Sequence, residues 1–229
     1  MNSAPKIYKM RIRFIVADAW DHKRIFAALR DMVLQSALPF EPAKVNKNWP
    51  RLAYGPALGY KQYSSGELAD LYFTQSLQET AVQDALVKSA PDGVRVLQVR
   101  RVPYALPSVS NLAEVMKYSV QGDFSSYAPA RSAVEFFSGK HIYITQQTSG
   151  AISLQQDIKP FVLSVAAPEA NKLELLLTRQ GDKTIKPEYV VAAWLGVPVE
   201  AEAAFTLPNI KFTREALYWR NSEGKLCAL

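Results

Sequence analysis

Apolar and polar residues alternate in the segment 6–16, as in a strand with one buried face. Alternate residues such as Met10 and Ile12 are apolar, and side chains with this spacing share one face of a sheet. The pattern changes to helical spacing after Asp21, which can cap a helix that Pro39 would end. The predicted stripe of this helix comprises Ile25, Phe26, Leu29, Met32, Val33 and Ser36.

The rest of the first half continues this order. Residues 67–73 predict a strand, and a capping-box pattern, Ser76-x-x-Glu79, precedes a run with helical spacing. A turn signal at residues 91–93 leads into a regularly alternating strand at 94–102. The first half therefore predicts strand, helix, strand, strand, helix, strand.

The second half follows that order less regularly. A short helix is expected near residues 125–139, with Pro129 in its first turn, and another from Pro187 to a stop at Gly196. Helices that alternate with mostly non-adjacent strands predict an α+β fold. We expect two ferredoxin-like halves, with mostly antiparallel sheets and helices packed on one face. Strands are expected at residues 116–122, 141–147, 161–167, 172–180 and 210–219.

The two halves are predicted as domains of residues 1–108 and 109–229. The Pro-rich segment 102–110 is the expected connection, extended and stiff. The two halves differ in net charge. The first holds 15 Lys and Arg against 9 Asp and Glu, whereas the second holds 12 Lys and Arg and 12 Asp and Glu. The first half is therefore basic and the second neutral, and the basic surface would attract anions.

The overall composition is that of a globular protein, with 48% hydrophobic residues in 229. No window is apolar enough for a membrane span, and the start of the chain lacks the apolar core of a secretory signal. A single cysteine, Cys227, allows no intrachain disulfide. We therefore expect a cytoplasmic protein with no membrane partner.

Most familiar reaction chemistry is missing from the sequence. There is no phosphate-binding GxxxxGK[ST] motif, and the glycines at 55, 59 and 66 do not have dinucleotide-binding spacing. One cysteine cannot hold an iron–sulfur cluster or a cysteine-rich zinc site, so no cofactor or metal is expected. The two histidines, His22 and His141, are expected to be surface or packing residues. No catalytic residue is identified.

One segment combines chemistry suited to nucleic acid. Residues 42–66 contain no acid, and they interleave basic with aromatic residues. Cations would contact phosphate, and exposed rings can stack on unpaired bases. The alternative is a solvated basic surface whose aromatic residues, such as Tyr54, partly face the core. The candidate nucleic-acid-binding residues are Lys44, Lys47, Trp49, Arg51, Tyr60, Lys61 and Tyr63.

Short stretches over nearly the whole chain share an order and spacing with a known family. They are MRIRF at 10–14, ALP at 37–39, PALG at 56–59, SGExxD at 65–70, DIKP at 157–160 and GDKTIKPEYVVAAWLG at 181–196. In this order they resemble the radical-SAM-linked protein family, whose members are fused to, or encoded beside, radical SAM proteins. The positions matched to the family are Gly59, Ser65, Gly66, Glu67 and Asp70.

The resemblance implies a radical SAM protein as partner. Since this chain lacks the cysteines for a cluster, the partner would perform the chemistry and this protein would recognise the substrate. Some members are encoded near ribonuclease and ribosomal-protein genes, which favours RNA as that substrate. Two segments depart from the family pattern: residues 19–23 stand in place of Ser-His-Leu-Asp, and residues 47–51 replace a Gly-Phe-Asn-Pro-rich segment.

The leading hypothesis is therefore a non-catalytic accessory or substrate-recognition protein, linked to a radical SAM enzyme and binding RNA. One alternative is an enzyme acting on a small anionic substrate in the cleft between the halves, with Glu67 or Asp70 and Lys61. Another is a protein–protein interaction module that binds another chain through its sheet.

Overall fold

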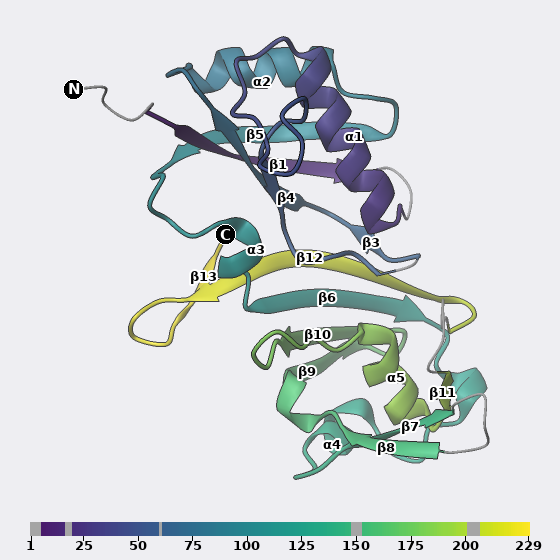
Figure 1. Cartoon of the computed structure of the whole chain (residues 1–229). Coiled ribbons are helices and arrows are strands. Elements are labelled where there is room, and N and C mark those ends of the chain that lie inside the picture. The colour runs from purple at the N-terminus through teal and green to yellow at the C-terminus, as the bar shows by residue number, and fades with distance from the viewer. Residues whose placement is uncertain (1–5, 17–19, 60, 148–152, 201–206) are drawn as a thin grey trace. The chain divides into compact units, whose positions relative to one another are not determined.

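The chain folds into two compact units, which we describe separately (Figure 1). The first unit contains the described residues up to Gly59, together with Ser64–Ala113 and Leu229, and the second contains residues 61–63 and Glu114–Ala228. The structure is a computed structural model that describes residues 6–16, 20–59, 61–147, 153–200 and 207–229.

The first unit has the ferredoxin-like order strand, helix, strand, strand, helix, strand. Its sheet has the spatial order β2-β4-β1-β5, and every described pairing in it is antiparallel. The elements are β1 (Tyr8–Val16), α1 (His22–Gln35), β2 (Leu52–Tyr54), β4 (Glu67–Phe73), α2 (Glu79–Lys88) and β5 (Val94–Val102).

Both helices of this unit cover the same face of its sheet. The alternating β1 residues Met10, Ile12 and Phe14 are fully buried, and they belong to one apolar cluster with Leu29 of α1 and Leu86 of α2. The period-two pattern of β1 and the helical pattern of α1 thus meet in one core. Asp21 caps α1 as predicted, because its carboxylate accepts a hydrogen bond from the N–H of Arg24 at 2.8 Å.

The second unit repeats this strand order, with insertions. Its largest sheet has the order β13-β12-β6-β10-β9, in which β12, β6, β10 and β9 correspond to β5, β1, β4 and β2 of the first unit. Its elements are β6 (Val115–Gly122), α4 (Ala133–Phe137), β7 (Tyr143–Gln147), β8 (Ser153–Asp157), β9 (Val162–Glu169), β10 (Lys172–Thr178), α5 (Pro187–Leu195), β11 (Val199–Glu200), β12 (Ile210–Arg220) and β13 (Leu226–Ala228).

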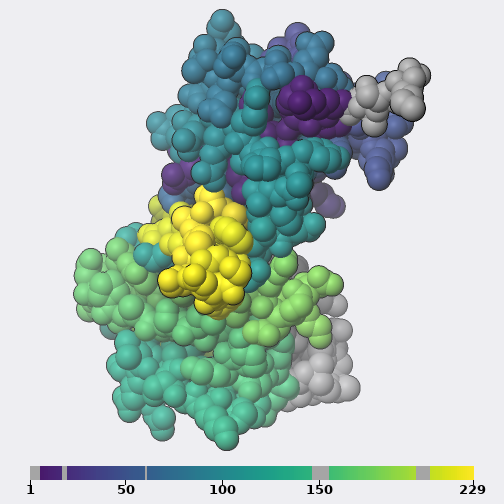
Figure 2. All heavy atoms as spheres, turned by 90° about the vertical axis from the view of Figure 1, so that its left-hand side faces the viewer, coloured from purple at the N-terminus to yellow at the C-terminus, as the bar shows by residue number. Residues whose placement is uncertain are grey.

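The predicted α+β class is confirmed, with mostly antiparallel sheets and a ferredoxin-like strand order in each half. Strand β3 (Tyr63–Ser64) begins in the second unit, where it pairs with β12. The inserted strands form a small sheet, β11-β7-β8, in which β11 runs parallel to β7. The turn between β12 and β13, in yellow, lies at the surface of the second unit (Figure 2).

Helix α5 is buried almost all round. Eight of its nine residues are buried, which fits its apolar sequence, because a helix without a polar face must be covered on every side. It begins with Pro187 and ends at Gly196, whose φ of +69° is the left-handed conformation that favours glycine. No helix in the described ranges is both long and apolar enough to cross a membrane.

The predicted capping box at Ser76 and Glu79 is wrong. Helix α2 begins at Glu79 itself, and no side chain caps it. Both side chains instead bind Arg101 of β5: Ser76 Oγ accepts from its guanidinium at 3.0 Å, and a Glu79 carboxylate oxygen accepts from its backbone N–H at 2.7 Å. The tertiary partner replaces the local cap.

The expected start of the helix near residues 125–139 is also wrong. Helix α4 begins after Ser132, whose Oγ caps the N–H of Glu135 at 3.2 Å. Pro129 precedes that cap, and a separate 3₁₀ turn, η1 (Ser125–Tyr127), comes earlier. A second 3₁₀ turn, η2 (Lys159–Phe161), precedes β9. Strands β8, β11 and β13 were not predicted from the sequence, since they are short and show little alternation.

The predicted stiff connection, residues 102–110, bends instead. Residues 103–106 form a turn, closed by a 3.1 Å hydrogen bond from Leu106 N–H to the Pro103 carbonyl. The short helix α3 (Val109–Leu112) follows it. The ammonium of Lys9 on β1 donates to the Leu106 carbonyl, which ties the bend to the sheet. Burial lowers the pKa of Lys9, although the nearby Asp70 opposes that shift.

A buried ion pair lies on the sheet face that α1 and α2 leave uncovered. The guanidinium of Arg11 donates to both carboxylate oxygens of Asp70, at 2.7 and 3.1 Å. The exposed fractions of the two side chains are 2% and 0%. Asp70 also accepts the N–H of Val109 at 2.8 Å, so its carboxylate joins β1, β4 and the start of α3.

We expect Asp70→Asn to lower the free energy of unfolding by about 3–5 kcal/mol, because it leaves the Arg11 charge buried and uncompensated. Urea unfolding followed by circular dichroism measures this loss. The matched control is Asp84→Asn, at an exposed position on α2, which should change stability by less than about 0.5 kcal/mol. Equal stabilities for the two variants would contradict the structural role assigned to the pair.

Candidate functional site

The residues predicted to bind nucleic acid fall into two groups. Lys44, Lys47, Trp49 and Arg51 belong to the first unit, whereas Lys61 and Tyr63 belong to the second. The remaining residue, Tyr60, lies outside the described residues. One group therefore belongs to each unit, and the two groups are described in turn.

The first group lies on residues 40–51, which we call the basic hairpin. Its base is a bridge between Pro42 and Pro50, and above it the N–H of Ala43 donates to the Trp49 carbonyl at 2.8 Å. At the tip, the side-chain oxygen of Asn46 accepts the N–H of Asn48 at 3.0 Å, a local turn that asparagine often makes. These bonds close residues 44–48 into a loop in which every residue except the partly buried Asn46 is exposed.

Two lysines occupy the tip of the basic hairpin. Lys44 and Lys47 are exposed, and Val45 between them is 89% exposed. Residues 42–50 include no Asp or Glu, so nothing within the loop neutralises the two ammonium groups. An exposed loop with this charge attracts anions through a field that salt screens.

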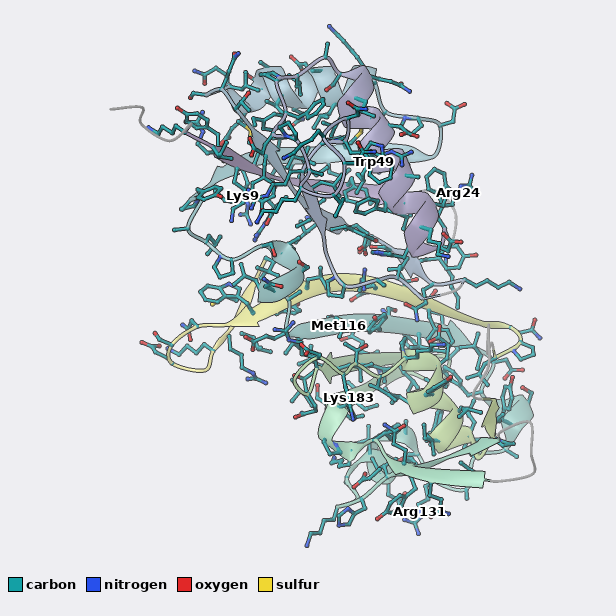
Figure 3. The ribbon with its side chains drawn as sticks, viewed as in Figure 1. Lys9, Arg24, Trp49, Met116, Arg131 and Lys183 are labelled. Carbon is teal, nitrogen blue, oxygen red and sulfur yellow. The ribbon has the colours of Figure 1, made fainter. Side chains whose placement is uncertain are left out.

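Trp49 and Arg51 are partly engaged within the first unit. Trp49 is 38% exposed and lies beside α1, where the Arg30 guanidinium is 4.9 Å from its ring centroid (Figure 3). The Arg51 guanidinium lies 4.1 Å from the ring centroid of Tyr72 and donates to the hydroxyl of Tyr104 at 3.2 Å. Arg51 therefore packs against the sheet, and Lys44, Lys47 and Trp49 are the more accessible members of the group.

The family-matched acids, Glu67 and Asp70, both lie on β4, and each has a different partner. Glu67 accepts a hydrogen bond from the hydroxyl of the buried Tyr54 at 2.9 Å, whereas Asp70 binds Arg11. Residues three apart on a strand face opposite sides, so the two carboxylates do not form a catalytic pair. Tyr54 belongs to the apolar core of this unit.

The other family-matched positions shape the backbone before β4. Gly66 is buried, and a Cβ there would lie 2.5 Å from Nε of Arg13, so glycine permits a close approach by that side chain. Ser65 is exposed, and Gly59 is half-buried. These residues therefore account for the local backbone conformation rather than for a chemical role.

His22 lies at a packing position and His141 at the surface, in line with the expectation that each is a surface or packing residue. The His22 ring stacks on Tyr54, with ring centroids 5.0 Å apart and planes 18° apart. His141 pairs with Asp157 through Nδ1 at 2.8 Å on an open surface. In the described part of the chain, no three His, Cys, Asp or Glu side chains gather in a way that could hold a metal ion.

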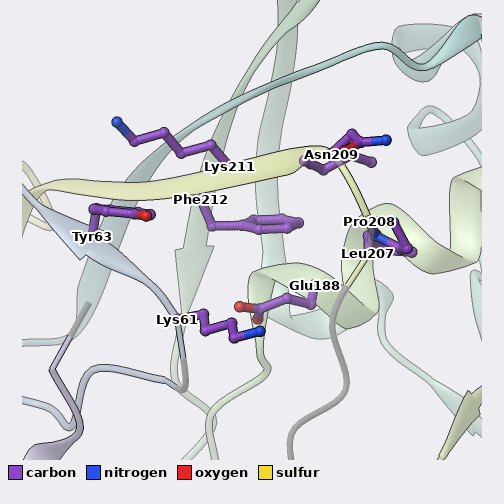
Figure 4. A pocket seen from close by; sticks show the side chains of 9 residues that line it. Lys61, Tyr63, Glu188, Leu207, Pro208, Asn209, Lys211 and Phe212 are labelled. Carbon is purple, nitrogen blue, oxygen red and sulfur yellow. The ribbon is translucent and has the colours of Figure 1, made fainter. Parts of the chain in front are cut away.

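The second group of residues lines a pocket within the second unit (Figure 4). The pocket has a volume of about 430 Å³. Only Lys61 and Tyr63 were candidate binding residues from the sequence, because three remote segments contribute the lining. Glu188 lies in the stretch 181–196 that carries the family resemblance, but nothing in that stretch indicates a binding role. The lining residues are Lys61, Tyr63, Glu188, Leu207, Pro208, Asn209, Ile210, Lys211 and Phe212.

Two residues of this pocket have left-handed backbones. Lys61 has φ of +56° and Asn209 has φ of +60°. Asparagine tolerates this conformation, but lysine adopts it rarely, and such residues are frequent at ligand sites. Gly122 on β6 allows the Asn209 turn, because a Cβ there would lie 2.7 Å from the Asn209 carbonyl oxygen.

Glu188 lines the pocket, and its carboxylate is paired with the buried Gln62. Glu188, in the first turn of α5, is 4% exposed, and Gln62 is 2% exposed. The Gln62 side-chain amide donates to both carboxylate oxygens of Glu188, at 2.9 Å each. Burial raises the pKa of Glu188 above its ordinary value, and the Gln62 hydrogen bond opposes this rise.

Aromatic and basic side chains form the rest of the pocket. The Lys211 ammonium lies 4.5 Å from the ring centroid of Tyr63, and the buried Leu207 and Phe212 add apolar walls. Apolar walls with a few convergent polar groups are typical of small-molecule sites. The pocket presents hydrogen-bond acceptors and cations, which suit binding, and its lining includes no serine, cysteine or histidine.

One family model matches the chain over residues 40–187, and its description is "Uncharacterized protein conserved in bacteria (DUF2344)". The match covers more than half of the chain. It includes the basic hairpin, Lys61 and Tyr63, and it ends one residue before Glu188. No curated protein matches the chain.

The raised pKa of Glu188 predicts how Glu188→Gln changes stability with pH. The folded protein holds this proton more tightly than the unfolded chain does, so its contribution is fully present below the unfolded-state pKa. That contribution is lost as the pH rises through the folded-state pKa. Melting temperatures between about pH 4 and pH 8 should therefore shift progressively in favour of the variant.

The variant keeps a side-chain oxygen that can accept from Gln62, and every other titrating group is the same in both proteins. The change in the difference with pH therefore isolates Glu188. A difference that stays constant over this range, or that moves in favour of the wild type, would show that burial does not raise this pKa.

Proposed function

The chain belongs to the DUF2344 family, and from the basic hairpin and the resemblance described above we propose that it is a non-catalytic substrate-recognition protein that binds RNA for a radical SAM enzyme. The observation that supports RNA binding most directly is the basic hairpin. It projects Lys44 and Lys47, without an intervening acid, beside a half-exposed Trp49.

The chemistry of this hairpin suits a single strand better than a folded protein partner. Lysines bind phosphate groups as flexible point charges, and an accessible indole ring can stack on an unpaired base. Arg30 already lies against the Trp49 ring, so a base would use the remaining exposed part of the indole. Binding of this kind depends strongly on salt and little on base sequence.

The proposed partner follows from the resemblance and from what this chain lacks. Radical SAM chemistry requires a cluster held by cysteines, and the single Cys227 cannot supply one. We therefore assign the reaction to the partner and recognition of its RNA to this protein. A cytoplasmic location is part of the same proposal.

The double variant Lys44→Ala/Lys47→Ala tests the role of the hairpin. Each lysine–phosphate contact contributes about 0.7–0.9 to the slope of log affinity against log salt. Titration of mixed tRNA at several salt concentrations should therefore give a slope smaller by about 1.5 for the variant. The affinity at low salt should fall as well.

The matched control is Lys140→Ala/Lys225→Ala, which removes two exposed lysines of the second unit. This control should retain the wild-type slope. If the salt slope decreases by the same amount in both double variants, the effect comes from net charge and not from the hairpin. If the affinity of the wild type does not change with salt, binding through phosphates is excluded.

Purification of the tagged protein from its native host tests the partnership. We expect RNA and an iron–sulfur protein with a radical SAM cysteine motif to co-purify, identified by sequencing and mass spectrometry. The Lys44→Ala/Lys47→Ala variant should retain less RNA. If other proteins co-purify, without RNA and without an iron–sulfur protein, the interaction-module alternative would replace this proposal.

A further inference from the structure

The first unit presents a second exposed aromatic ring, Tyr104, which lies outside the basic hairpin. We propose that Tyr104 stacks on an unpaired base of the same RNA strand whose phosphates bind Lys44 and Lys47. This inference rests on the proposed function, since it extends the RNA-binding surface from the hairpin to the turn after β5. It can fail while RNA binding by the hairpin holds, and the experiments below separate the two outcomes.

Two acid-free segments of the first unit meet at this ring. Residues 42–59 contain two lysines and one arginine, and residues 93–113 contain three arginines, with no Asp or Glu in either segment. The Arg51 guanidinium of the first segment donates to the Tyr104 hydroxyl of the second at 3.2 Å. The fold therefore places the ring where two basic stretches come together, a surface that attracts a polyanion.

The Tyr104 side chain is exposed and yet held in place. Its exposed fraction is 52%. The ring lies edge-to-face against Tyr72, with centroids 6.3 Å apart and planes at 83°. Arg51, which binds the Tyr104 hydroxyl, itself lies 4.1 Å from the ring centroid of Tyr72. A ring whose orientation is fixed before binding loses little conformational freedom when a base stacks on it.

The backbone that carries the ring is fixed as well. Residues 103–106 form a closed turn, and the Lys9 ammonium donates to the last carbonyl of that turn. One proline precedes Tyr104 and another follows the turn, and each restricts the chain. The turn therefore presents Tyr104 on a stiff support.

The charges around the ring leave a surplus of cations. Arg100 is exposed, and it lies opposite Arg11 in the pairing of β5 with β1, so its side chain is on the helix-free face of the sheet. The Arg11 charge is balanced by Asp70. Arg51 has one acid near enough to interact with it, Glu41. Arg51 and Arg100 together therefore exceed that acid in charge.

A nucleic-acid strand uses both features of this surface. A base offers a flat face to Tyr104, and its phosphates meet the cations. An acidic peptide would use the charges and leave the ring uncovered. Trp49 of the hairpin is two residues before Arg51, which binds Tyr104. One short single strand can therefore reach both exposed rings.

Fluorescence anisotropy of the full chain with a labelled oligouridine RNA, about 12 nucleotides long, tests the proposal. Tyr104→Ala should weaken binding by about fivefold or more, because it removes the stacking surface. The slope of log affinity against log salt should not change, because the ring contacts no phosphate. Tyr104→Phe keeps the ring, so its affinity should stay within about twofold of the wild-type value.

These variants separate this inference from the hairpin proposal. Unchanged affinity in Tyr104→Ala, together with a smaller salt slope in Lys44→Ala/Lys47→Ala, would overturn the inference and leave the hairpin proposal intact. No RNA binding by the wild type would overturn both. Equal losses in Tyr104→Ala and Tyr104→Phe would assign the effect to the hydrogen bond with Arg51 and overturn the stacking role.

A probe without bases separates stacking from charge. An oligonucleotide of the same length with abasic sugars keeps the phosphates and removes every base. The wild type should prefer oligouridine to this probe, and Tyr104→Ala should lose part of that preference. If Tyr104→Ala weakens both probes by the same factor, the ring contacts no base and the proposal is overturned.

The matched control is Tyr143→Ala. Tyr143 is 53% exposed, almost the same fraction as Tyr104, and it lies on β7 of the second unit. This control should bind oligouridine as the wild type does. Equal losses in Tyr143→Ala and Tyr104→Ala would show a general effect of removing a surface ring and would overturn the proposal.

Photocrosslinking locates the contact without any change to the protein. Oligouridine that contains 4-thiouridine is irradiated in complex with the wild-type chain, and mass spectrometry identifies the crosslinked residues. We expect crosslinks at Tyr104 and at Trp49. Crosslinks within residues 44–49 with none at residues 103–106 would overturn the inference.

Discussion

The buried ion pair between Arg11 and Asp70 is the constraint on which the first unit depends. In an RNA-binding ferredoxin-like domain of the RRM type, the face of the sheet without helices is open and presents aromatic residues to bases. Here the same face contains an ion pair whose side chains are at most 2% exposed. Asp70 also binds the N–H of Val109, so residues of the connection cover part of the face. The proposed binding of RNA therefore uses another part of this unit, the basic hairpin, where Lys44 and Lys47 are exposed.

The two units share a strand order but use it differently. The first unit keeps the simple four-stranded arrangement and extends the chain between α1 and β2 as the hairpin. The second adds β7, β8 and β11, which form a second small sheet, and it buries α5 on nearly every side. Burial of α5 brings Glu188, in its first turn, out of water and beside the start of β12. The pocket thus results from the same packing that makes α5 a core helix.

Periodicity and turn chemistry accounted for most of the elements. Strand β4 has the predicted bounds, and α5 begins at Pro187 and stops at Gly196 as expected. The errors occurred where a distant residue outweighed a local preference. Ser76 and Glu79 have the spacing of a capping box, but Arg101 offers both of them stronger partners from β5. Local spacing contains no information about such a competitor.

The sequence by itself determined the fold class, the repeated strand order and the acid-free segment that became the basic hairpin, because these depend on local patterns of polarity and charge. Only the tertiary structure decided which of those residues are accessible and which are engaged. Arg51 packs on Tyr72, whereas Lys44 and Lys47 remain exposed. It also brought Gln62 to Glu188, which is 126 residues away. A contact of that range depends on how the sheets and α5 pack, and no spacing along the chain encodes it.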